Sequence, residues 1–148
     1  MFSDVRGLLA AAMARFEETL PGPASGLEVS QLRQRALDAL RIALPDPYVS
    51  FLGEVNGFEW NGCIAYGADH ENVRPGVDFV EQNLAWRGDD EWNRRFVYFG
   101  ESGTSWFVLD LVDSKFKVLD IPSGDEVRTV GDFDELVAAI GAEALGLS

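Results

Sequence analysis

The segment Gly100-Glu101-Ser102-Gly103-Thr104 is the part of this sequence that comes nearest to a catalytic motif, the nucleophile elbow of serine hydrolases. That elbow requires glycine where Thr104 stands and a helix after the serine, whereas the apolar residues 106–110 are typical of a strand. A serine nucleophile also needs a base, and His70 is the only histidine. We therefore interpret the segment as a turn between two strands and expect that the protein is not an enzyme.

The run Asp69-His70-Glu71 contains three types of metal-binding side chain. Adjacent residues in an irregular loop rarely converge on one ion, and neither a second histidine nor a pair of cysteines completes a coordination shell. Cys63 is the only cysteine, which excludes an intramolecular disulfide and makes a reducing cytoplasm the expected compartment. Its apolar neighbours favour a small buried hydrophobe over a reactive thiol. We expect no metal and no cofactor.

The charge balance favours some partners and disfavours others. Acidic side chains outnumber basic ones 25 to 12, the net charge is −13, and 15 of the acidic residues follow residue 74. Such a field repels nucleic-acid phosphates and anionic membranes and attracts basic proteins. No apolar run reaches the roughly eighteen residues that a membrane span needs. A basic protein is therefore the favoured partner, although a charge that only maintains solubility is an open alternative.

Two tryptophans stand beside carboxylates in the sequence. Trp60 follows Glu59, and Trp92 follows Asp89-Asp90-Glu91. Tryptophan serves either in a core or as the anchor of an interface, and both roles are open for these two residues. An aromatic anchor within an acidic rim would bind a basic protein surface. The candidate partner-binding residues are Trp60, Asp69, Glu71, Asp89, Asp90, Glu91, Trp92, Asp113, Asp125 and Glu126.

Three helices are predicted in the first third of the chain. Apolar residues at helical spacing indicate a helix over 4–19 with Ser3 as its N-cap. A second apolar stripe over 32–44 predicts a helix with Ser30 as its N-cap. The residues 46–55 begin with Asp-Pro and predict a short third helix that stops before an Asn-Gly pair.

A sheet is predicted in the rest of the chain. Asn61-Gly62 fits a two-residue hairpin turn between residues 58–60 and 63–66, and an irregular stretch with one helix near 77–85 follows. Asp132 and Glu135 form a capping pair for a last helix that reaches residue 140. Four further strands, joined by short loops that favour an antiparallel meander, are predicted over 96–99, 106–110, 116–120 and 126–130.

These elements predict one α+β domain over residues 1–148. We expect a mixed or antiparallel sheet of about five to six strands, packed against N-terminal helices and one C-terminal helix.

The order and spacing of several motifs resemble the SUKH superfamily, which includes the Smi/Knr-like cell-wall assembly regulators of yeast and many bacterial proteins. The resemblance spans about residues 29–141. The motifs are Leu44-Pro45-x-x-Tyr48-x-x-Phe51-Leu52-x-x-x-Asn56-Gly57, Tyr66-Gly67, Phe99-Gly100-Glu101-Ser102-Gly103, a strand ending in Asp110, and Asp132-Phe133-x-x-x-Val137.

The resemblance implies a mixed sheet packed against helices, without a shared catalytic centre. For many bacterial members it also implies a role as immunity proteins, which neutralise toxins that include nucleases. We therefore expect an immunity-type protein, a monomer or weak homo-oligomer, that binds a basic toxin domain directly. A regulatory or scaffold module for protein interactions is one alternative, and an uncharacterised carboxylate-dependent enzyme is another, since a fold leaves function open.

Overall fold

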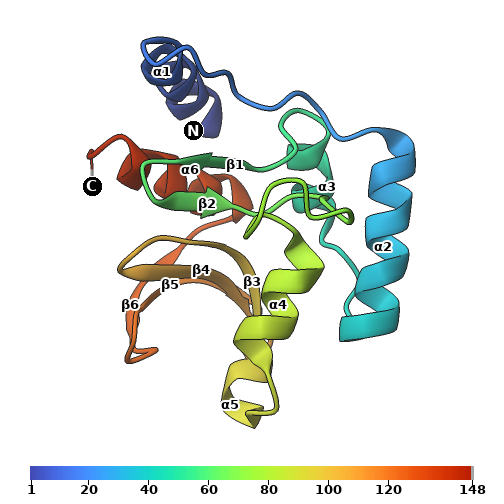
Figure 1. The fold of residues 1–148 in the computed structure, drawn as a ribbon. Coiled ribbons are helices and arrows are strands. Elements are labelled where there is room, and N and C mark those ends of the chain that lie inside the picture. The colour runs from blue at the N-terminus through green and yellow to red at the C-terminus, as the bar shows by residue number, and fades with distance from the viewer. Residues whose placement is uncertain (148) are drawn as a thin grey trace.

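The computed structural model describes residues 1–147, and within them it contains six helices and one six-stranded sheet (Figure 1). The helices are α1 (Phe2–Ala14), α2 (Gly26–Leu40), α3 (Asp46–Leu52), α4 (Phe79–Arg87), α5 (Glu91–Arg94) and α6 (Phe133–Ala144). The strands are β1 (Phe58–Trp60), β2 (Cys63–Ala65), β3 (Phe96–Glu101), β4 (Ser105–Asp110), β5 (Lys115–Asp120) and β6 (Glu126–Val130).

The strands lie in sequence order from β1 to β6, and every neighbouring pair is antiparallel. This arrangement confirms the expected α+β fold and the predicted meander. Asn61 and Gly62 both have positive φ values in the turn between β1 and β2, which is the backbone that an Asn-Gly hairpin turn requires.

The boundaries of α1 and α2 differ from the sequence prediction. The N-cap of α2 is Ser25, because Ser25 and Glu28 form a reciprocal capping box, so the assignment of Ser30 as the cap was wrong. The helix ends before Arg41, whose φ of 58° is left-handed. The last part of the predicted stripe, from residue 41 to Leu44, is therefore not helical. Ser3 likewise lies inside α1, which begins at Phe2 and ends at Ala14.

The sheet has two faces that different helices cover. On the face that packs against α6, which we call the α6 face, the rings of Phe99 and Phe116 lie 5.3 and 5.9 Å from that of Phe133. On the opposite face, which we call the α4 face, the ring centroid of Trp106 lies 5.3 Å from that of Trp86 in α4. Because side chains alternate along a strand, neighbouring residues of β4 and β5 serve different faces.

Asn83 fixes α4 against the sheet. Its side-chain nitrogen donates to the carbonyl oxygens of Phe79 and Tyr98, at 2.9 and 2.8 Å, and its side-chain oxygen accepts from the Tyr98 N–H at 2.8 Å. Asn83 is fully buried. The register of β3 shifts between Tyr98 and Gly100, and the Asn83 side chain supplies hydrogen-bond partners for the backbone groups of Tyr98 at this irregularity. The helix α5, which follows α4, packs against β3, where the ring of Trp92 lies 5.9 Å from that of Phe96.

Candidate protein-binding site

The side chain of Trp92 stands at the surface where α5 meets the sheet. Asp90 caps α5 by accepting a hydrogen bond from the Trp92 N–H at 2.9 Å. The guanidinium carbon of Arg95 lies 4.5 Å from the centroid of the Trp92 ring, and a Cβ atom at Gly124 would lie 3.8 Å from Trp92 Nε1. The ring therefore bridges α5 and the turn between β5 and β6, yet 54% of the residue is exposed.

Beneath Trp92 lies a buried ionic cluster. Asp110, at the end of β4, is fully buried and accepts hydrogen bonds from Arg95 Nε at 3.1 Å and Lys117 Nζ at 2.8 Å. Lys117 also lies 2.7 Å from the carboxylate of Asp113 and 3.9 Å from that of Glu126. Burying Asp110 is tolerable only because two cations compensate its charge.

The charge states of this cluster follow from those contacts. Burial would by itself raise the pKa of Asp110, but the hydrogen bonds from Arg95 and Lys117 hold it well below its ordinary value. The same bond with Asp110, together with that to Asp113, raises the pKa of Lys117. Three carboxylates therefore face two cations at neutral pH. We call Trp92, Arg95, Asp110, Asp113, Lys117 and Glu126 the Trp92 cluster.

The structure brings seven of the ten sequence-predicted site residues to this region. Trp92, Asp113 and Glu126 belong to the cluster, and Asp125 is exposed beside Gly124 in the turn that contacts the Trp92 ring. The other three are exposed at the start of α5, where the carboxylate of the first lies 3.5 Å from Arg94: Asp89, Asp90 and Glu91.

The remaining three predicted residues lie elsewhere. Trp60 is half-buried on β1, and its ring lies 5.5 Å from that of Phe16. Asp69 is buried rather than presented at the surface, because its carboxylate accepts from the N–H groups of Val73 and Arg74 at 3.1 and 2.7 Å. Glu71 is exposed in the same loop.

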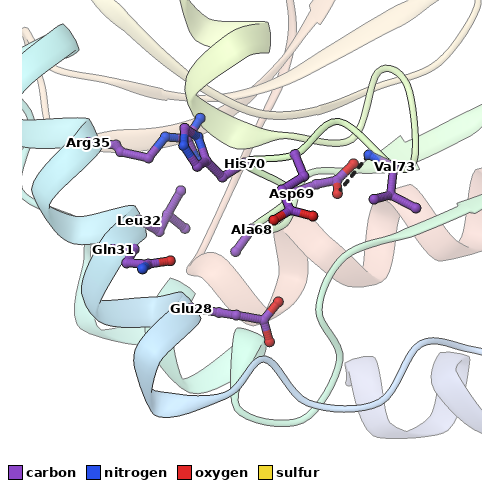
Figure 2. A pocket seen from close by; sticks show the side chains of 9 residues that line it. Glu28, Gln31, Leu32, Arg35, Ala68, Asp69, His70 and Val73 are labelled. Carbon is purple, nitrogen blue, oxygen red and sulfur yellow. Dashed lines mark hydrogen bonds between the residues drawn. The ribbon is translucent and has the colours of Figure 1, made fainter.

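Asp69 and Glu71 border a cavity of about 220 Å³ between α2 and their loop (Figure 2). Glu28 and Arg35 of α2 also line it, and the figure shows these two side chains on the helix and those of Asp69 and Val73 on the loop. Arg35 is already engaged by the buried carboxylate of Asp78 at 2.6 and 3.0 Å. Carboxylates thus also border this cavity, which shares no residue with the Trp92 cluster.

Sequence reasoning missed Arg95, Asp110 and Lys117 as site residues. A signal for two of them exists: Asp110 ends an apolar strand and Lys117 interrupts another, Phe116-Lys-Val-Leu119. A charged residue inside an apolar strand needs a partner of opposite charge, so the ion pair between Asp110 and Lys117 could have been predicted from the sequence. Their pairing with Arg95 depended on the register of the sheet.

The motifs that the sequence suggested for catalysis have structural roles. Ser102 lies in the turn between β3 and β4, as predicted, and its hydroxyl accepts from the N–H groups of Thr104 and Ser105. Cys63 is buried, which raises the pKa of its thiol to about 11. Within residues 1–147, no group of three or more His, Cys, Asp and Glu side chains is placed to hold a metal ion.

No protein-family model matches the chain, and no curated protein matches its sequence significantly. In the part of the chain that the structure describes, the helices are too short or too polar to cross a membrane. The fold and the site define the class of this protein. It has an α+β fold and presents one exposed tryptophan, Trp92, near several carboxylates.

Proposed function

We propose that this protein is an immunity-type protein of the SUKH kind, which binds a basic toxin directly and blocks it without catalysis of its own. The observation that carries the proposal is the Trp92 cluster, in which an exposed tryptophan is fixed among carboxylates. The motif order described above supports the SUKH assignment.

The contacts that fix Trp92 suit an interface anchor. Tryptophan is enriched among the few residues that dominate binding energy, and a side chain that is already ordered loses little entropy when it binds. Asp90 fixes the Trp92 backbone, Arg95 lies over the ring and the Phe96 ring lies 5.9 Å from it, while more than half of the residue stays exposed. A pocket on a partner can therefore receive the ring at small entropic cost.

The surrounding charge suits a basic partner. Asp125 and Glu126 follow Gly124, which lies near the Trp92 ring, and Glu91 precedes Trp92 on α5; all three carboxylates are exposed. Toxins that cut nucleic acids need cationic clefts for the phosphate backbone, so an acidic surface is complementary to them. Complementary charge speeds association, and a buried aromatic anchor slows dissociation.

The experiment compares two pairs of acidic residues that carry equal charge. The double variant Asp125→Asn/Glu126→Gln removes two charges beside Trp92, and the control Glu17→Gln/Glu18→Gln removes two exposed charges after α1. The tagged protein captures its partner from a lysate of the organism that encodes it, and affinity is measured at two salt concentrations. We expect the first pair to weaken binding by about tenfold at low salt and to reduce its salt dependence, with the control nearly unchanged.

Two further readouts decide the proposal. The captured partner should arrest growth when it is expressed alone, and co-expression of this protein should restore growth. Equal losses for the two variants would mean that only net charge matters and would refute the site. Several weak partners, none of them toxic, would refute the immunity function and favour a regulatory module.

A further inference from the structure

The strand β6 forms an open edge of the sheet. It pairs with β5 on one side, and within residues 1–147 no strand pairs with its other side. The residues Glu126 to Thr129 are all exposed. An edge of this kind presents unpaired N–H and C=O groups, which accept an added strand.

The opposite edge is different. The strand β1 has three residues, and α1 covers it, with the ring of Phe2 6.1 Å from that of Phe58 and the ring of Phe16 5.5 Å from that of Trp60. Figure 1 shows α1 beside β1 and places β6 at the other end of the sheet. The two edges therefore give a natural comparison within one molecule.

On the α6 face, the β6 edge borders a groove that is apolar in part. The register pairs Arg128 with Val118 and Val118 with Phe107, so Arg128 points to this face. A groove of about 190 Å³ lies there; the buried side chains of Phe107, Val118 and Ala139 line part of it, and Ser105, Arg128 and Glu143 line the rest with Val127. An apolar side chain of an added strand would contact the apolar part of this groove.

On the α4 face, the same edge is acidic. Glu126 is paired in register with Leu119, and Leu119 with Trp106, which places Glu126 on the face of the Trp92 cluster. Its carboxylate lies 3.9 Å from Lys117 Nζ, an amine that Asp110 and Asp113 already engage at 2.8 and 2.7 Å. Glu126 is therefore incompletely neutralised, and a basic side chain of an added strand would meet it here.

We propose that the β6 edge receives an extended segment of the partner as a seventh strand, and that this segment alternates apolar and basic residues. The apolar side chains face the groove beside α6, and the basic ones face Glu126 and the Trp92 cluster. The choice of a basic partner rests on the proposed function, whereas the open edge and its two unlike faces do not. A second copy of this chain is disfavoured as the occupant, because each copy carries a net charge of −13.

The test uses a synthetic nine-residue peptide that alternates valine and lysine, with blocked ends, titrated into isotope-labelled protein. Two matched probes accompany it: a peptide of the same composition with the valines and lysines in separate blocks, and the alternating peptide with every second backbone nitrogen methylated. We expect amide shift changes confined to residues 119–130 and to the part of α6 around Ala139. Both matched probes should bind about tenfold more weakly, since one loses the alternation and the other the backbone donors.

Two variants locate the peptide. Glu126→Lys reverses the charge at the β6 edge and should weaken binding by about tenfold, and Glu59→Lys makes the same reversal at the exposed middle of β1 and should change it by less than about twofold. Shifts at β1, equal binding of the methylated peptide, or no binding at millimolar peptide would each overturn the inference. Shift changes of the protein alone on concentration would identify a second copy as the occupant and would also overturn it.

Failure here is distinguishable from failure of the proposed function. If the captured toxin loses affinity in Asp125→Asn/Glu126→Gln while the peptide leaves β6 unperturbed, the immunity function stands and the added strand does not. If the peptide binds at β6 and no toxin is captured, the edge is a binding surface for another class of basic protein.

Discussion

Substitution of Asp110 by asparagine should reveal how strongly the ionic cluster holds the site together. The change keeps the shape of the side chain and removes its charge, which leaves Arg95 and Lys117 facing a neutral group. Breaking a buried ion pair by removing one partner costs about 3–5 kcal/mol. We expect about 3 kcal/mol, the lower end, because Asp113 still pairs with Lys117 and because Arg95 is partly exposed.

The pH dependence of this loss has a definite sign. The pKa of Asp110 is depressed in the folded state, so its charge contributes stability above its unfolded pKa of about 3.9, and that contribution is lost as the pH falls towards the folded value. The stability gap between wild type and Asp110→Asn should therefore shrink below pH 4, at up to about 1.4 kcal/mol per pH unit. A gap of about 3 kcal/mol at pH 7 becomes about 2 kcal/mol at pH 3.

Urea unfolding at pH 7 and pH 3, followed by circular dichroism, measures this gap. The matched control is Asp125→Asn, the same substitution at an exposed residue, which should change stability by less than about 0.5 kcal/mol at both pH values. A gap below about 1 kcal/mol at pH 7, or a gap of the same size at pH 3, would show that the Asp110 charge is not what stabilises the cluster.

Two further substitutions test how the site is positioned. Asn83→Ala removes the side chain that joins α4 to Tyr98 and leaves buried backbone groups unpaired, so urea unfolding should show a loss of about 3 kcal/mol. Gly100→Ala adds a Cβ atom 2.5 Å from the carbonyl oxygen of Ile64 and 2.6 Å from Ile140 Cδ1, and thermal unfolding should report a loss of about 1–3 kcal/mol from this overpacking. A loss below about 0.5 kcal/mol in either measurement would contradict the respective packing argument.

The parts of the fold that the sequence predicted are those that local chemistry decides. The Asn61-Gly62 turn, the strands of the meander and the Asp132 cap of α6 each depend on residues within a few positions of one another. The start of α2 was mistaken although its signal is equally local, because Ser25 and Glu28 precede the apolar stripe. The error arose because the helix start was placed from the apolar stripe and not from the capping pair.

The Trp92 cluster was predicted only in part, since its geometry depends on contacts between distant segments. The carboxylates around Trp92 were identified from charge and sequence proximity, but Gly124 reaches the ring from 32 positions away, through the turn between β5 and β6. Arg95 meets Asp110 only because β3 and β4 pair in one particular register. A one-residue slip would turn Asp110 to the α6 face and remove the cluster.

The rigidity of this cluster favours one tight partner over many weak ones. Surfaces that bind many partners use flexible side chains, above all methionine, which repack for each ligand. This chain has two methionines, and one of them, Met13, is buried in the core. Trp92 instead lies on Arg95, Arg95 is tied to Asp110, and Asp110 is tied through Lys117 to β5. An anchor fixed through such a chain of contacts fits one complementary pocket well and others poorly, which supports an immunity function over a scaffold.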